Sequence, residues 1–396
     1  MSDYLFVLHS LKPKGGSEIA SAWMLQALAE RGGVTVLTHM PDHDLAITDA
    51  VCGTTLANCS LKWIHTNSKL IRLIKRCGIK HHTLWFRSFV REARRQRPYH
   101  RYLVTSFGEA DFGTGFPKAI QYLHATPGRH SHLMNRDQFV GRSLPMMILA
   151  WFNLKLCDLF APWDDERTKE NFTVANSYFT SESYRALYGK EADAVVYPPP
   201  VGSARTIERA HRKLAFLAMA RADPQKGWDD TVGIVKGLRD RGHNVTLTMF
   251  VLTSSSAPVT LQWIKENAES NSSWLTLRLN ASRAEIDRAI GEHRFGLHCG
   301  WGETYGMAVA EMLLGGCLTS VRESGGQTEI VTELELRFRR RKDAIEKWDA
   351  ILRDPELEAR LLSSQAARRE LYSREAFFKN FHTMMDQFEA RYPVPP

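Results

Sequence analysis

The sequence predicts an α/β protein with parallel sheets, and three observations lead to that fold class. The chain has 396 residues, which is enough for two domains that each bury a core. Short apolar runs alternate with longer amphipathic stretches, the order that produces parallel sheets covered by helices. Several of the short runs end in glycine-rich turns, as in doubly wound domains. The hydrophobic content of 43% and charged content of 24% are ordinary for a globular protein.

The N-terminal residues read as the opening of a doubly wound domain. A strand at Tyr4–His9 leads into a turn containing Gly15 and Gly16, then a helix to about Arg31 and a strand at Val34–Thr38. Two glycines there would let the backbone approach a diphosphate closely. The spacing is not G-x-G-x-x-G and no acid follows the second strand suitably, so NAD binding is weakly supported.

The rest of the first half continues the strand–helix pattern. Further strands are expected at Cys59–His65, Tyr102–Phe107, Ala119–His124, Phe172–Asn176 and Ala194–Tyr197. His124 stands at a strand's carboxyl end, where it either faces a ligand crevice or is a hydrogen-bonded structural histidine. His130 and His132, in the polar loop that follows, could touch an acceptor. Pro198–Pro200 would fix an extended hinge after the last strand.

The second half repeats the pattern. Strands are expected at Leu214–Met219, Val245–Leu252, Trp274–Leu279, Arg294–Cys299 and Cys317–Val321, and helices at 228–241, 260–270, 283–292, 305–314, 343–352, 356–367 and 374–391. Ser282 is a plausible N-cap. Arg221 and Lys226 follow the first of these strands, where two cations can neutralise a diphosphate. The alternative is that both are ordinary surface cations.

Two carboxylates stand out between Phe295 and Val331. Glu303 lies in a glycine-rich turn, and Glu311 is the only polar side chain in the helical segment Met307–Leu314. A carboxylate in so apolar a helix is costly unless something bonds to it. Helical side chains lean toward the N-terminus, so we expect Glu311 to point into the same crevice as Glu303. The alternative is a solvated Glu303 and a Glu311 bonded to nearby backbone.

This stretch resembles the signature of retaining GT-B glycosyltransferases of family 4, which is E-x7-E followed by GG-x-x-E. The matching residues are Glu303, Glu311, Gly325, Gly326 and Glu329. The turn at Gly15 and Gly16, and the Arg221–Lys226 pair, also match this family's pattern. The resemblance implies two Rossmann-like domains facing across a cleft. It implies an N-terminal acceptor domain at 1–202, a nucleotide-sugar domain at 203–375, and a C-terminal helix at 376–396 that crosses back to the first domain.

The resemblance also implies roles. Arg221 and Lys226 would hold the donor diphosphate, Glu303 and His124 the donor sugar, and Glu311 the ribose. The remaining donor-binding positions that it implies are Gly15, Gly16, Asn280, Thr304, Tyr305, Gly306 and Met307. The donor would be GDP- or UDP-linked, the acceptor a glycan or lipid-linked molecule, and neither a metal nor another cofactor is expected.

The segment before Gly302 departs from the family's usual pattern. It reads His298–Cys299–Gly300–Trp301 in place of the commoner Pro-Ser lead, and Thr304 and Tyr305 replace Gly-Phe. This form is similar to mannosyltransferases that act on lipid-linked oligosaccharides, which favours GDP-mannose and polysaccharide or glycolipid biosynthesis. Two alternatives stay open: a non-catalytic GT-B relative, and an NAD-dependent Rossmann oxidoreductase.

The net charge of +8 is concentrated in one segment. Residues 69–101 hold eleven Lys and Arg against one acid, Glu92, with aromatic and aliphatic residues between them. This is either an anionic-membrane surface or two amphipathic helices with solvated basic faces. No known nucleic-acid motif accompanies the charge. Six scattered cysteines and the absence of a basic, apolar leader favour a cytoplasmic protein, in the first interpretation peripheral on the membrane.

Overall fold

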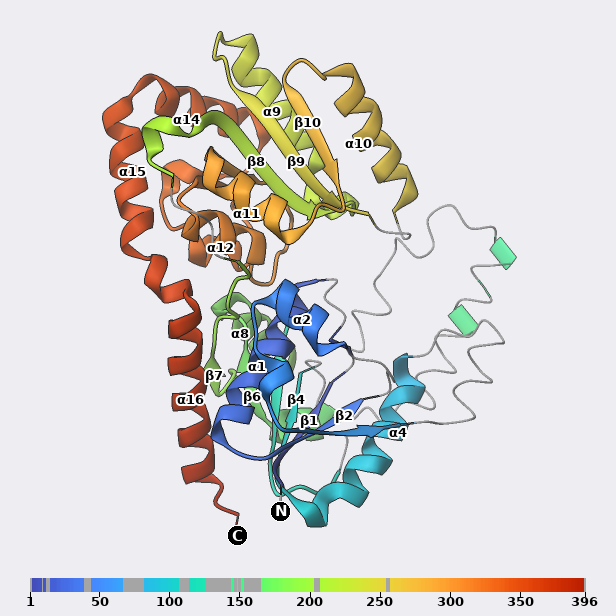
Figure 1. Ribbon diagram of the computed structural model, residues 1–396. Helices are drawn as coiled ribbons and strands as arrows, with labels where there is room; N and C mark the ends of the chain where they lie inside the picture. The colour runs from blue at the N-terminus through green and yellow to red at the C-terminus, as the bar shows by residue number, and fades with distance from the viewer. Residues whose placement is uncertain are drawn as a thin grey trace. The chain divides into compact units, whose positions relative to one another are not determined.

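Figure 1 shows the computed structural model. The structure describes residues 2–8, 10–11, 15–38, 44–66, 82–106, 114–125, 144–145, 148, 151–152, 165–202, 207–253 and 257–394. They group into two compact units, one of Met1–Val196 with Phe378–Pro396 and one of Tyr197–Phe377. The boundaries expected from the sequence, after residues 202 and 375, remain a prediction.

The first unit is built on a seven-stranded parallel sheet of order β3-β2-β1-β4-β5-β6-β7. Its strands are β1 (Ser2–Val7), β2 (Val34–Thr38), β3 (Leu61–His65), β4 (His100–Thr105), β5 (Ala119–Leu123), β6 (Phe172–Ala175) and β7 (Ala194–Val195). The order reverses between β1 and β4, which is the topological switch point of a doubly wound sheet.

The first unit also contains several helices. They are α1 (Gly16–Arg31), α2 (Leu45–Cys52), α4 (His82–Gln96), α7 (Asp165–Glu170), α8 (Tyr178–Tyr188) and most of α16 (Arg374–Arg391). The ring of Phe388 on α16 lies 5.2 Å from that of Phe172 and 5.5 Å from that of Tyr102. Tyr4 donates a hydrogen bond to Glu389 (2.6 Å). The C-terminal helix is therefore part of the first unit's core.

The second unit holds a six-stranded parallel sheet of order β10-β9-β8-β11-β12-β13. Its strands are β8 (Lys213–Arg221), β9 (Thr246–Leu252), β10 (Leu275–Leu279), β11 (His293–His298), β12 (Leu318–Arg322) and β13 (Arg337–Phe338). Its helices are α9 (Trp228–Asp240), α10 (Pro258–Ser270), α11 (Arg283–Glu292), α12 (Met307–Leu314), α13 (Gln327–Ile330), α14 (Arg341–Arg353) and α15 (Pro355–Ala367).

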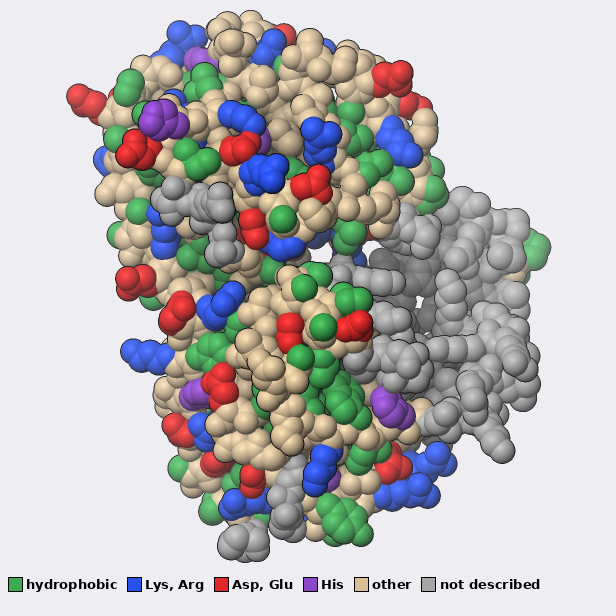
Figure 2. Space-filling view, in the orientation of Figure 1, with side chains coloured by type: hydrophobic (Ala, Val, Ile, Leu, Met, Phe, Trp, Pro, Cys, Tyr) green, Lys and Arg blue, Asp and Glu red, His purple; other side chains and the backbone are tan. Residues whose placement is uncertain are grey.

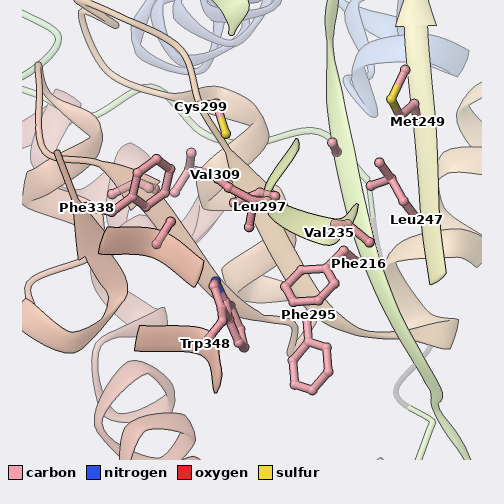
Figure 3. Close-up of a cluster of buried hydrophobic side chains, with 14 of the residues drawn as sticks. Phe216, Val235, Leu247, Met249, Phe295, Leu297, Cys299, Val309, Phe338 and Trp348 are labelled. Carbon is pink, nitrogen blue, oxygen red and sulfur yellow. The ribbon is translucent and has the colours of Figure 1, made fainter. Parts of the chain in front are cut away.

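Alternate residues of β8 enter different cores, because a parallel sheet is buried on both faces. Phe216 belongs to the cluster shared with α9 and α14, whereas Leu217 belongs to the cluster shared with α11. In the first cluster the rings of Phe216 and Phe295 lie 4.7 and 4.9 Å from that of Trp348 (Figure 3). This packing fixes β8 and β11 side by side at the centre of the sheet.

The predicted fold class, α/β with two doubly wound sheets, is confirmed. Three short elements were not predicted: α2, α7 and β13. The helix expected from about Tyr305 begins at Met307, because Gly306 has φ +108°, outside the right-handed helical region. His130, His132 and residues 69–81 of the basic segment lie outside the described residues.

The structure describes residues 82–101 of the basic segment, so the two interpretations of that segment can be compared with the structure only there. In α4, Phe89, Val90 and Ala93 are buried while Arg91 and Arg94 are exposed. Helix α4 is therefore amphipathic, with a solvated basic face. Contact of the basic segment with a membrane remains a prediction. Within the described part of the chain, no helix has the length and apolar character needed to cross a bilayer.

Candidate functional site

The site is built where the sheet of the second unit changes winding direction, between β8 and β11. In doubly wound sheets, ligands bind outside the carboxyl ends of strands at such a point. The turn Pro224–Lys226 follows β8, and the loop that carries Glu303 follows β11. Lys226 and Glu303 are thus brought together although 77 residues separate them.

Glu303 is the centre of this arrangement. Lys226 donates from Nζ to Oε1 of Glu303, and Nε2 of His298 lies 3.1 Å from the same oxygen. The three side chains are largely buried, with 17%, 16% and 5% of the Glu303, Lys226 and His298 side chains exposed. Burial alone would raise the pKa of Glu303, but the His298 hydrogen bond and the Lys226 charge hold that pKa well below its usual range. The carboxylate is therefore ionised at neutral pH.

Backbone contacts hold the two turns against each other. The amide of Trp301 donates to the carbonyl of Gln225 (2.9 Å). Gly227 has φ +65°, and a Cβ there would overlap the carbonyl of Cys299. Only glycine therefore lets the turn after β8 lie directly on the end of β11, which sets Lys226 beside Glu303.

A second close approach fixes the loop from the β12 side. The amide of Gly326 donates to the carbonyl of Glu303 (2.7 Å). Gly325 has φ +80°, and a Cβ on it would overlap the Glu303 backbone. Gln327, fully buried, donates to the carbonyl of Gly300 (3.0 Å). The glycine pair singled out in the sequence thus positions the backbone of Glu303.

Arg322 also holds the loop that carries Glu303 in place. Its guanidinium donates to the carbonyls of Cys299 (3.0 Å) and Arg339 (2.9 Å) and pairs with Asp230. It also lies 3.9 Å from the ring centroid of Trp301, within cation–π range. One buried arginine therefore ties β11, β12 and α9 to the exposed Trp301 at the site.

Arg221, the other predicted cation, is at the end of β8. Its side chain is 54% exposed and its Nε lies 3.1 Å from Asp223. Its carbonyl accepts from the indole of Trp228 (3.0 Å). The structure thus makes Arg221 a solvent-accessible cation next to the Lys226 turn, and Lys226 a largely buried one.

Glu311 is bonded to protein groups. Its Oε2 accepts from Nη1 of Arg283 (2.9 Å), and its Oε1 from the amide of Val201 (3.4 Å). Arg283 also pairs with Asp287 on α11. Burial raises the pKa of Glu311, and the Arg283 charge works against that rise. The costly carboxylate of α12 is therefore compensated mainly by an arginine that the sequence analysis did not single out.

The second unit also contains five further predicted donor-binding residues, Asn280 and the four from Thr304 to Met307. Thr304 is partly exposed, and the Tyr305 side chain is buried with its ring 5.5 Å from that of Tyr197. Gly306 is the N-cap of α12 and Met307 its first residue, so backbone amides gather there. Asn280 has φ +49°, and its Oδ1 accepts from the Thr253 amide (2.9 Å).

Three predicted residues belong to the first unit. Gly15 is the N-cap of α1 and Gly16 its first residue, in the connection that follows β1. His124 directly follows β5, with its ring 5.0 Å from that of Tyr122. Burial lowers the pKa of His124 to about 4, although a hydrogen bond with the Ser106 backbone opposes the change, so the imidazole is neutral at pH 7.

Comparisons with known proteins identify the architecture. No protein-family model matches the sequence, and a search of curated proteins also found no match. Among solved structures, Anabaena HepE in complex with UDP and glucose aligns with a TM-score of 0.67 at 12% identity over 98% of this chain and 100% of its own. The chain has the GT-B fold.

Other GT-B structures align over almost the whole chain. Thermosynechococcus elongatus sucrose-phosphate synthase has a TM-score of 0.67 at 13% identity, covering 99% of this chain and 100% of its own. WaaG, a glycosyltransferase involved in lipopolysaccharide biosynthesis, has a TM-score of 0.65 at 13% identity, covering 97% and 99%. At such identities the likeness establishes the fold.

The structure adds residues that the sequence analysis did not assign to the site. His298 ends an apolar strand, and a histidine in that position is a usable signal, although the sequence analysis assigned it no role in the site. Arg283 and Asp287, one helical turn apart, carried no signal toward Glu311 because α11 and α12 meet only in the folded sheet. Arg322 could not be linked to Trp301 and Asp230 from sequence for the same reason.

Proposed function

We propose that this protein is a glycosyltransferase that moves a sugar from a nucleoside diphosphate donor to a glycan or lipid-linked acceptor. The observation that carries the proposal is the Lys226–Glu303 pair at the switch point of the second sheet. A buried cation at the carboxyl end of a central strand suits a diphosphate, and a fixed carboxylate suits sugar hydroxyls. The GT-B fold that the chain shares with HepE and sucrose-phosphate synthase supports the proposal.

In the proposed reaction, the bond from the sugar's anomeric carbon to the diphosphate breaks and a bond to the acceptor oxygen forms. Lys226 and Arg221 neutralise the leaving diphosphate, helped by the amides at Thr304–Met307 and by Gly15 and Gly16. The leaving phosphate takes the acceptor's proton, on the same face of the sugar, which gives retention. No nucleophile is assigned, and positioning with charge stabilisation supplies most of the rate.

Other residues hold the donor. Glu303 and His124 position the sugar, Glu311 the ribose, and the backbone near Asn280 the base. When ribose arrives, Glu311 keeps Arg283 as its counter-ion, so the carboxylate remains charged while it accepts hydroxyl hydrogen bonds. We propose that this chemistry uses no metal ion.

The donor and acceptor are narrower proposals. HepE was crystallised with UDP-glucose, which supports testing UDP-linked donors first. The His298–Trp301 segment resembles family 4 mannosyltransferases, which supports GDP-mannose and a role in polysaccharide or glycolipid biosynthesis. The site of action would be cytoplasmic, at a membrane surface if the basic residues 69–101 bind anionic lipid.

The experiment is an assay of nucleoside diphosphate release from UDP-glucose and GDP-mannose, with sugar and lipid-linked acceptors, using wild type and Lys226→Ala. We expect release with one donor, stimulated by an acceptor, and a product that keeps the donor's anomeric configuration by NMR. An inverted product would reject retention. Equal release by Lys226→Ala would reject the assigned site.

A further inference from the structure

A cavity of about 480 Å³ lies in the second unit at the amino end of β11, the end opposite His298. One wall is a single face of α15, and arginines from three other segments complete it. The residues that matter here are Arg209, Arg294, Arg369, Glu358, Leu362 and Ala366.

The charges in this cavity do not balance. Oε1 of Glu358 accepts from Nε of Arg209 (2.9 Å) and from Nη2 of Arg294 (2.6 Å). One carboxylate therefore serves two guanidinium groups. Among the residues that the structure describes, Arg369 forms no ion pair with a carboxylate, and its Nε has no hydrogen-bond partner. The lining carries an excess of positive charge.

Such a group of partly buried positive charges is energetically unfavourable by itself. Burial lowers the pKa of Arg369, and the positive charge of Arg209 lowers it further. Bringing partly buried like charges together costs free energy unless an anion compensates them. Arg209 and Arg294 also lie over the ring of Phe295, at 5.7 and 5.6 Å from its centroid, and Glu358 holds both guanidinium groups in place. Fixed guanidinium groups lose little conformational entropy on binding.

We propose that this cavity binds a small molecule bearing a phosphate group, at a site separate from that of the nucleotide sugar. Guanidinium groups bind phosphate through paired N–H donors. The Arg369 guanidinium, which has no carboxylate partner among the described residues, lines this space together with Arg209 and Arg294, which share Glu358. The cavity is within the size range of small-molecule sites. Leu362 and Ala366 offer an apolar wall to the rest of such a molecule.

The test is calorimetric titration of the full chain with inorganic phosphate and with phenyl phosphate, at an ionic strength held constant with NaCl. Wild type is compared with Arg369→Gln, with Lys226→Ala, and with Arg360→Gln as the matched control. Arg360 is on α15, nine residues before Arg369, but it pairs with Glu335 outside the cavity. We expect at least tenfold weaker phosphate binding by Arg369→Gln alone, and tighter binding of phenyl phosphate than of phosphate by the other three proteins.

Three results would overturn the proposal. They are no phosphate binding by wild type, equal affinity in Arg369→Gln, and loss of binding in Lys226→Ala, which would put the phosphate in the nucleotide site. Arg369→Gln should also unfold at the same or a higher temperature than wild type without ligand, because it removes an uncompensated charge. Should that variant fold poorly, Arg369→Lys keeps the charge without the paired donors, and unchanged phosphate affinity in it would reject the guanidinium assignment.

Discussion

The Glu303 carboxylate is the residue on which the candidate site depends. Desolvation works against its charge, while His298 and Lys226 hold that charge in place. In the free protein Glu303 serves as counter-ion to Lys226. A donor diphosphate would compete for Lys226 and release a carboxylate oxygen for a sugar hydroxyl. In the proposed function, the pair would thus be a preorganised site whose two halves serve different parts of one ligand.

Replacing Lys226 with alanine should lower turnover about a hundredfold or more, because it removes a cation from the developing charge of the leaving group. The matched control is Lys236→Ala, an exposed lysine on α9 in the same unit. Steady-state kinetics and circular dichroism of both variants are the measurement. A folded Lys226→Ala enzyme with wild-type turnover would show that Lys226 is not part of the chemistry.

Glu311→Gln separates a ligand-binding role from a structural one. If Glu311 holds the ribose, we expect the nucleotide Kd to rise about tenfold, since a charge-assisted hydrogen bond contributes about 1.5–3 kcal/mol. Arg283 keeps Asp287 as a partner, which limits the loss of stability. The measurements are nucleotide titration and urea unfolding. Lower stability with an unchanged Kd would support the purely structural reading of Glu311.

The lowered pKa of His124 leads us to expect a specific pH dependence of the protein's stability. Its pKa is lowered to about 4 in the folded protein, below its ordinary value of about 6.5, so the unfolded chain binds more protons between these values. Wild type should therefore lose stability from this group as the pH falls from about 6.5 to about 4. In His124→Gln that contribution should be absent, which urea unfolding at pH 7.5 and pH 5 would detect as a smaller difference. An identical pH dependence in both proteins would show that His124 is not held neutral.

Individual site residues were predictable where the chain itself carries the pattern. Lys226 and Glu303 could be chosen because each follows an apolar strand, at the edge where parallel strands end together. The partners of Glu311 could not, because Arg283 is 28 residues away on a helix whose packing depends on the whole sheet. His298 is recognisable in the sequence as a polar residue at a strand end, but its contact with Glu303 depends on the conformation of the loop between them.

At the scale of elements, glycine turns set how closely β8, β11 and β12 approach one another. Gly325→Ala should destabilise the protein by more than the cost of a left-handed residue, about 1–2 kcal/mol, because its Cβ would also overlap Glu303. Gly242→Ala is the matched control, with φ +93° and open space around the added atom. Urea unfolding compares the two. Equal losses of stability would mean that the Gly325 loop can shift away from Glu303 at no cost.

Elements with strong local signals were predicted well. Ser282 caps α11 as expected and forms a capping box with Glu285. The missed elements have weak signals. Strand β13 is two residues long, and in α2 the apolar side chain of Ile47 is 57% exposed, so its sequence lacks a clean buried face. Periodicity cannot find an element that buries so little.

At the scale of the whole molecule, the fold followed from the repeated order of strand, turn and helix. Both sheets have the doubly wound strand order that this repetition implies. On the face of the second unit that Figure 2 shows, acidic and basic side chains are interspersed. The identity of the acceptor could not be inferred from the sequence, because the loops that would bind it have no regular sequence pattern.

The proposed chemistry also makes a prediction for the whole protein. Because Lys226 and Arg221, rather than a metal ion, are assigned to the leaving diphosphate, turnover should be unchanged after treatment with EDTA and dialysis. Donor turnover before and after chelation, with Mg²⁺ and Mn²⁺ added back, is the measurement. A loss of activity that a divalent ion restores would require a metal in the mechanism.

The most direct test of the central claim is the unfolding temperature of wild type and Lys226→Ala with UDP, GDP, ADP and NAD. A ligand at 100 times its Kd should stabilise the protein by about 2.7 kcal/mol. We predict a selective rise with UDP or GDP in wild type and a much smaller rise in Lys226→Ala. Stabilisation by NAD instead, or by no nucleotide at all, would contradict a nucleotide-sugar site at Lys226 and Glu303.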